Sequence, residues 1–137
     1  MNPLRQLLKS AGSHAPLGTW IMSASPLVTE AMGHAGFQWG VIDMEHTPLD
    51  MMEVIHLLQA AGNTKMVPIV RVPWNDTVHI KRVLDAGAQT LLIPFVQNAD
   101  EARRAVAATR YPPEGVRGLA VMSRGSKFGT VSDYAKT

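Results

Sequence analysis

The sequence contains no cysteine, which excludes disulfide frameworks, thiolate nucleophiles, and zinc or iron–sulfur sites bound by cysteine. It also lacks a block of like charge. The 13 basic and 11 acidic residues are dispersed and leave a formal net charge of +2, so no electrostatic footprint for nucleic acid is present. Any metal would have to bind His, Asp or Glu side chains, and small molecules are the expected partners.

Long apolar runs are absent as well. The longest strongly apolar stretch, residues 91–96, is far shorter than the ~20 residues of a membrane helix. The first ten residues have the pattern of a short amphipathic helix and lack the apolar core of a signal peptide. No Gly-rich phosphate-binding motif occurs. We therefore expect a cytoplasmic protein with no membrane partner.

Short β-rich runs alternate with amphipathic helical runs four times along the chain. Its 137 residues, 46% of them hydrophobic, suit one domain. Glycines or prolines end the helical runs, as expected at helix C-termini. The predicted strands are 17–22, 39–44, 66–72 and 90–96, and the predicted helices are 26–35, 50–61, 77–86 and 99–110.

The strands are almost continuously apolar, which is typical of a parallel sheet with both faces buried. Their starts recur every roughly 22 to 27 residues, as successive βα units do in a barrel or in an open doubly wound sheet. A complete (β/α)₈ barrel takes ~250 residues. The fold class is therefore α/β, and as a barrel the chain would be the first four βα units of a (β/α)₈ TIM barrel, with residues 1–137 forming the N-terminal half of a single domain.

Reactive side chains in parallel α/β folds gather where strands end. The segment after the second predicted strand is the richest such place, because Asp43, Glu45 and His46 lie within four residues. His46 is the natural proton-transfer group, since an imidazole titrates near working pH. The alternative is a capping cluster, in which Asp43 or Glu45 satisfies backbone amides and His46 is a solvated loop residue.

Arg71 ends the third apolar strand, where a guanidinium is costly unless an anion meets it. A substrate carboxylate or enolate oxygen would serve, and so would an internal ion pair with Asp43 or Asp85. Asp85 lies in the last turn of its helix, where the helix dipole disfavours an anion. A cationic partner such as protonated His46 would explain its presence, and so would exposure to solvent.

Several stretches together resemble the HpcH/HpaI class II aldolases, the family of 4-hydroxy-2-oxoheptanedioate and 2-dehydro-3-deoxyglucarate aldolases. The likeness covers nearly the whole chain. Its most specific parts are the acidic–His motif that ends a strand and the Tyr-Pro-Pro-Glu-Gly motif. The stretches are Gly36-Phe37 with Trp39, residues 41–46, 70–73, 91–96 and 109–118.

The resemblance implies metal-dependent cleavage of a 4-hydroxy-2-oxo acid to pyruvate and an aldehyde. His46 resembles the catalytic histidine and Asp85 its dyad carboxylate. Arg71 matches the arginine that steadies the substrate oxygens, Asp43 lines the same pocket, and Trp20 matches a position near the aldehyde.

The resemblance also implies a divalent metal, Mg²⁺ or Mn²⁺, whose ligands are expected beyond residue 137 because this stretch contains no metal-ligand motif of the family. Two alternatives to an enzyme stay open. In the first, the chain is a non-catalytic, self-associating half barrel with a carboxylate-binding pocket around Arg71. In the second, it is an inert structural fragment. In each case a half barrel exposes two sheet edges, so a homo-oligomer is expected.

Overall fold

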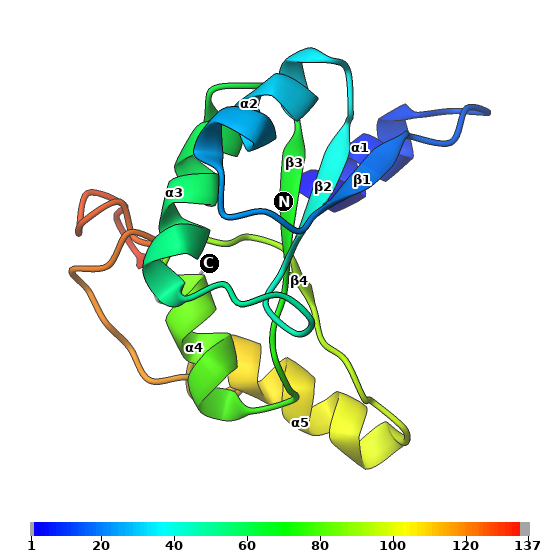
Figure 1. Cartoon of the computed structure of the whole chain (residues 1–137). Helices are drawn as coiled ribbons and strands as arrows, with labels where there is room; N and C mark the ends of the chain where they lie inside the picture. Colours follow the sequence, from blue (N-terminus) through cyan, green and yellow to red (C-terminus); the bar gives the residue numbers. More distant parts are fainter. Residues whose placement is uncertain (1, 135–137) are drawn as a thin grey trace.

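The computed structural model describes residues 2–134, in which helices and strands alternate along the chain. Figure 1 shows the strands side by side and the helices arranged around them. The elements, in order, are α1 (Pro3–Ser10), β1 (Gly18–Ile21), α2 (Pro26–His34), β2 (Trp39–Asp43), α3 (Met51–Gly62), β3 (Val67–Arg71), α4 (Thr77–Asp85), β4 (Leu91–Leu92) and α5 (Ala99–Thr109).

The four strands form one parallel sheet in the order β1-β2-β3-β4, so each strand joins beside the one before it. A doubly wound sheet reverses its strand order at a switch point, whereas successive units of a (β/α)₈ barrel do not. The strand order therefore decides between the two architectures that periodicity left open. The chain has the α/β fold of four consecutive units of a barrel, as predicted.

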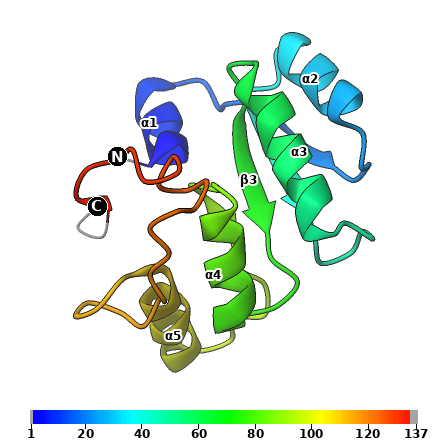
Figure 2. The same ribbon diagram turned by 90° about the vertical axis from the view of Figure 1, so that its left-hand side faces the viewer.

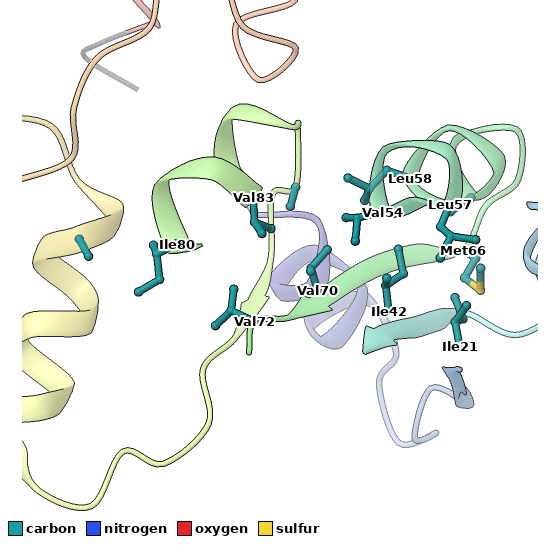
Figure 3. Packing of buried hydrophobic residues seen from close by; sticks show 13 residues of the cluster. Ile21, Ile42, Val54, Leu57, Leu58, Met66, Val70, Val72, Ile80 and Val83 are labelled. Atoms are coloured by element: carbon teal, nitrogen blue, oxygen red, sulfur yellow. The ribbon is translucent and has the colours of Figure 1, made fainter. Parts of the chain in front are cut away.

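The hydrophobic core lies between the sheet and its helices. Ile21, Ile42 and Val70 sit at neighbouring positions on β1, β2 and β3 and are at most 1% exposed. Figure 3 shows these side chains directed toward α3 and α4. Since side chains alternate along a strand, the residues just before and after them face the opposite side. The helices contribute Val54, Leu57, Leu58, Ala61, Ile80, Val83 and Ala108 to the core.

Side-chain caps fix where the helices begin. Asp50 and Glu53 form a capping box at the start of α3, and Asp76 accepts hydrogen bonds from two backbone amides at the start of α4. Ser25 caps α2, with Pro26 in its first turn as the sequence predicts. Because each helix begins just after a strand ends, these caps also fix the loops at the carboxyl edge of the sheet.

The opposite, amino edge of the sheet is covered by α1 and by the segment after α5. The Asn2 side chain donates a hydrogen bond to the carbonyl of Gln89, just before β4, at 2.6 Å. Residues 118–134 run past the end of α4, as Figure 2 shows, and Arg124 donates to the carbonyl of Ala86 at 3.0 Å. Among residues 2–134, no helix is long and apolar enough to cross a membrane.

The fourth strand is shorter than the predicted 90–96, because only Leu91 and Leu92 pair with β3. Pro94 has no backbone N–H to donate, and Phe95 adopts a left-handed φ of 55° that a strand cannot continue. The other predicted boundaries agree with the observed ones to within one residue at each end.

Candidate active site

The register of β2 and β3 brings Asp43 and Arg71 together. They are the last residues of their strands and are paired positions in the parallel ladder, so their side chains leave the sheet on the same face. The Arg71 guanidinium donates from Nε to Asp43 Oδ1 at 2.9 Å and from Nη2 to Oδ2 at 2.7 Å. This two-point contact is the planar geometry that best fixes a guanidinium.

Asp43 is the fixed anchor of the site. It is 1% exposed, and its Oδ1 also accepts hydrogen bonds from the backbone amides of Glu45 at 2.9 Å and His46 at 3.3 Å. Burial alone would raise the pKa of Asp43, but the hydrogen bonds from Arg71 and from these amides hold it below its ordinary value. The capping role considered for Asp43 is thus real, and it accompanies the ion pair.

Arg71 is fully charged at any working pH, because the hydrogen bond to Asp43 raises its pKa further. Of the internal partners proposed for it, Asp43 is confirmed. A guanidinium carries five N–H donors. Two of these donors bind Asp43 and a third binds Glu45. Among residues 2–134, the other two donors have no described partner.

Glu45 joins this pair, which sequence reasoning did not predict. Its Oε2 lies 2.9 Å from Arg71 Nη1, and its side chain is only 8% exposed. Its Oε1 lies 3.6 Å from Nε2 of His46, whose side chain is 67% exposed. The signal was present in the sequence, because Glu45 follows Asp43 by two residues in a turn that Asp43 itself closes. Glu45 therefore links the fixed arginine to the exposed histidine.

Trp20 covers one face of the guanidinium. The Arg71 Cζ lies 4.5 Å from the centroid of the indole ring, in a cation–π contact, and Trp20 is 44% exposed. Trp20 comes from β1, so three adjacent strands contribute to one site. The structure thus brings together four of the five predicted site residues: Trp20, Asp43, His46 and Arg71.

Asp85 is the predicted residue that does not join them within the chain. It is the last residue of α4, a helix that begins beside the carboxyl end of β3 and runs back for nine residues, or about 13 Å. It therefore lies toward the opposite edge of the sheet from His46. Its cationic partner is Arg117, whose Nη2 lies 2.7 Å from Asp85 Oδ1. Within the chain the structure therefore pairs Asp85 with Arg117 and not with His46, and the His46–Asp85 dyad stays a prediction.

Arg117 is 6% exposed and lies against the ring of Tyr111, with its Cζ 4.6 Å from the ring centroid. Burial would lower its pKa, but hydrogen bonds to Asp85 and Tyr134 raise it. The anion at the helix end that the sequence left unexplained is thus neutralised by a cation from the segment after α5.

Two further aromatic side chains stand at the same edge of the sheet, on the side of β4. Trp74 and Phe95 are stacked with ring centroids 4.5 Å apart, and they are 52% and 54% exposed. Both follow the ends of strands, β3 and β4 respectively. They give the carboxyl edge an apolar surface beside its charged residues.

The described side chains do not form a metal site. Within residues 2–134, no three His, Asp or Glu side chains are grouped as a metal ion requires. The two carboxylates of the candidate site, Asp43 and Glu45, are both bound by Arg71. What these residues can do is bind an anion at Arg71 and move a proton at His46.

Comparison with known proteins gives a consistent set of relatives. The profile of the HpcH/HpaI aldolase/citrate lyase family matches residues 17–134. The chain is 51% identical over 122 residues to the 2-dehydro-3,6-dideoxy-6-sulfogluconate aldolase of Pseudomonas putida, covering 89% of this chain and 48% of that protein. It is 51% identical over 124 residues to the 5-keto-4-deoxy-D-glucarate aldolase of Salmonella arizonae, covering 90% of this chain and 48% of that protein.

The chain spans about half the length of the curated relatives it matches. Among solved structures it is similar to an HpcH/HpaI aldolase/citrate lyase family protein from Burkholderia cenocepacia. The TM-score is 0.90 with 40% sequence identity, and the match covers all of this chain and 55% of the other.

Proposed function

Because the chain belongs to the HpcH/HpaI aldolase/citrate lyase family, we propose that the whole protein is a carbon–carbon lyase that cleaves a 4-hydroxy-2-oxo acid to pyruvate and an aldehyde. One observation carries this proposal. Arg71 is held in a fixed orientation at the carboxyl edge of the sheet, with two N–H donors available and the proton-accepting His46 in the adjacent loop.

Arg71 supplies the electrostatic part of the reaction. Its remaining donors bind the carboxylate and the 2-oxo oxygen of the substrate. When the bond between C3 and C4 breaks, its electron pair forms a double bond between C2 and C3, and the π pair of the carbonyl moves onto the 2-oxo oxygen, which gives the enolate of pyruvate. A fixed guanidinium stabilises that oxygen without having to reorganise. Asp43 acts through Arg71, as its positioning residue.

His46 supplies the proton transfer. Its neutral imidazole accepts the proton of the 4-hydroxyl group as C4 becomes the carbonyl carbon of the aldehyde. The imidazolium can then return a proton to C3 of the enolate, which gives pyruvate. Trp20, lying on Arg71, bounds the space in which the aldehyde half of the substrate would lie.

The proposal includes a divalent metal, Mg²⁺ or Mn²⁺, which the family resemblance implies. The described side chains do not fit such an ion, since they gather no set of three ligands. We therefore propose that the ligands of this metal in the whole protein lie outside residues 2–134.

We propose an acid derived from a sugar as the substrate. Two aldolases that are 51% identical to this chain are named for a sulfogluconate and a glucarate derivative. Pyruvate release from 2-dehydro-3-deoxyglucarate and from 4-hydroxy-2-oxoheptanedioate, compared with Mg²⁺ or Mn²⁺ and with a chelator, tests the substrate class and the metal together. Faster release from the heptanedioate would contradict the choice of a sugar acid.

The binding half of the proposal is tested by titrating the chain with oxamate, a pyruvate analogue, and following tryptophan fluorescence. We expect Arg71→Lys to weaken binding at least about tenfold, because an ammonium cannot reproduce the planar fork. Arg103→Lys is the matched control, since Arg103 pairs with Asp100 on the exposed side of α5. Equal binding by the wild type and Arg71→Lys would contradict the site. Oxamate binding without pyruvate release by the whole protein would favour the non-catalytic alternative.

A further inference from the structure

Two carboxylates share the single guanidinium of the site. Asp43 holds Nε and Nη2 of Arg71, and Glu45 holds Nη1 at 2.9 Å. The exposed fractions of the three side chains are 1%, 8% and 19% for Asp43, Glu45 and Arg71. The trio carries a formal net charge of −1, so an arriving anion meets an excess of negative charge in a partly buried place.

The two carboxylates are not held equally. Asp43 accepts two hydrogen bonds from Arg71 and two from backbone amides, and it leaves directly from the end of a strand. The contacts described for the Glu45 carboxylate in residues 2–134 are Nη1 of Arg71 and, at 3.6 Å, Nε2 of His46. Glu45 is therefore the carboxylate that can exchange.

We propose that Glu45 is an internal competitor of the substrate carboxylate. In the free protein it occupies Nη1 of Arg71. When a 2-oxo acid binds the two remaining donors of Arg71, its carboxylate also competes for the donor on Nη1, and Glu45 gives this donor up and turns to His46, which its second oxygen already faces. This role rests on the proposed function of Arg71 as the substrate-binding residue. It makes Glu45 a specificity-determining residue, because Glu45 repels an arriving anion and yields Nη1 only to one whose own contacts with Arg71 outweigh the contact it displaces.

The test is oxamate titration of the 137-residue chain by calorimetry, comparing the wild type with Glu45→Gln. The substitution keeps the shape of the side chain, removes one negative charge and weakens the hold on Nη1. We expect roughly tenfold tighter binding of oxamate, since a like charge next to the bound anion is removed. Glu114→Gln removes the same charge from an exposed position after α5 and is expected to bind as the wild type does.

A second variant keeps the test decisive if Glu45→Gln does not fold. Glu45→Asp withdraws the carboxylate by one methylene from Nη1, so it is also expected to bind oxamate more tightly than the wild type. Unchanged or weaker binding by both variants, with unchanged circular dichroism, would overturn the competitor role.

The outcomes separate this inference from the proposed function. If oxamate binds the wild type and depends on Arg71, but neither Glu45 variant strengthens it, only the role of Glu45 is wrong. If oxamate binds none of the proteins, both the competitor role and the binding half of the proposed function are wrong.

Discussion

Asp43 is a buried carboxylate whose cost is offset by four hydrogen bonds, two of them from Arg71. Removing one partner of a buried pair leaves the other charge uncompensated. We expect Asp43→Asn to lower the free energy of unfolding at neutral pH by roughly 3–5 kcal/mol, measured by urea denaturation. Asp100→Asn, in an exposed pair on α5, should cost less than about 1 kcal/mol.

We also expect the destabilisation caused by Asp43→Asn to depend on pH. The folded pKa of Asp43 lies below its ordinary value of 3.8. Its contribution to stability is thus complete above pH 3.8 and is lost as the pH falls through the lower folded pKa. The difference in unfolding free energy between the wild type and Asp43→Asn should therefore shrink in acid. A difference that stays constant down to the acid limit would show that the carboxylate charge is not what stabilises the site.

His46 is exposed and makes few contacts, so its replacement should cost activity and little stability. In the whole protein we expect His46→Ala to lower turnover by about 10²–10⁴-fold, the usual effect of losing a general base. His56→Ala, on the exposed side of α3, is the matched control and should be nearly silent. Full turnover by His46→Ala would assign the proton transfer to another group.

The sequence predicted the members of the site better than their contacts. Trp20, Asp43, His46 and Arg71 could be found because strand ends in a parallel sheet share one edge. The Glu45 contact was missed although Glu45 follows Asp43 by two residues, since the contact depends on how a four-residue turn directs its side chains. The Asp85 dyad stays a prediction, because a helix reverses the chain direction and a residue in its last turn lies at the other edge of the sheet from His46 within the chain.

At the scale of elements, the segment after α5 is anchored to the end of α4 by the buried Arg117, which contacts the half-buried Asp85 and Tyr111. Burial raises the pKa of Tyr111 in this segment to about 12. The stability that depends on its neutral phenol is present below the ordinary pKa of 10.0 and is lost as the pH rises toward 12. We expect the wild type to lose on the order of 1–2 kcal/mol of unfolding free energy across this range.

Tyr111→Phe should flatten this alkaline decline, because a phenyl ring does not ionise. Urea denaturation of both proteins at a series of alkaline pH values measures it. An equally steep decline in Tyr111→Phe would locate the alkaline sensitivity elsewhere.

The strands and helices were predictable because the apolar periodicity and the capping residues mark the same element boundaries. The exception is β4, whose apolar run 91–96 has the composition of a strand throughout. Composition records how well a side chain suits burial, whereas pairing requires a backbone N–H and an extended φ. Pro94 lacks the N–H and Phe95 lacks the extended φ, and within residues 2–134 β4 pairs with β3 alone.

At the scale of the whole molecule, the helices among residues 2–134 cover one face of the sheet, and β1 and β4 are its edge strands in this part of the chain. Trp20 and Leu92 remain more than 40% exposed. Unpaired strand edges with apolar side chains favour pairing with another chain. We therefore predict that the 137-residue chain self-associates, with closed two-fold pairing as the simplest assembly.

Sedimentation equilibrium over a range of protein concentrations measures this association. A lysine introduced at an edge, as in Thr19→Lys on β1, should shift the equilibrium toward the monomer. Thr130→Lys, an exposed position after α5, controls for the added charge. A monomer that persists at the highest concentrations would contradict the prediction.

The Asp43–Arg71 pair also has a consequence for how the strands find their alignment during folding. Side chains alternate along a strand, so a slip of β3 by one residue would turn Arg71 toward the helices and set Val70 or Val72 opposite Asp43. The apolar residues of β3 tolerate such a slip far better than a buried carboxylate without a counter-charge does. The two paired charges of the candidate site thus also select the strand register, because only the native alignment of β2 and β3 brings them together.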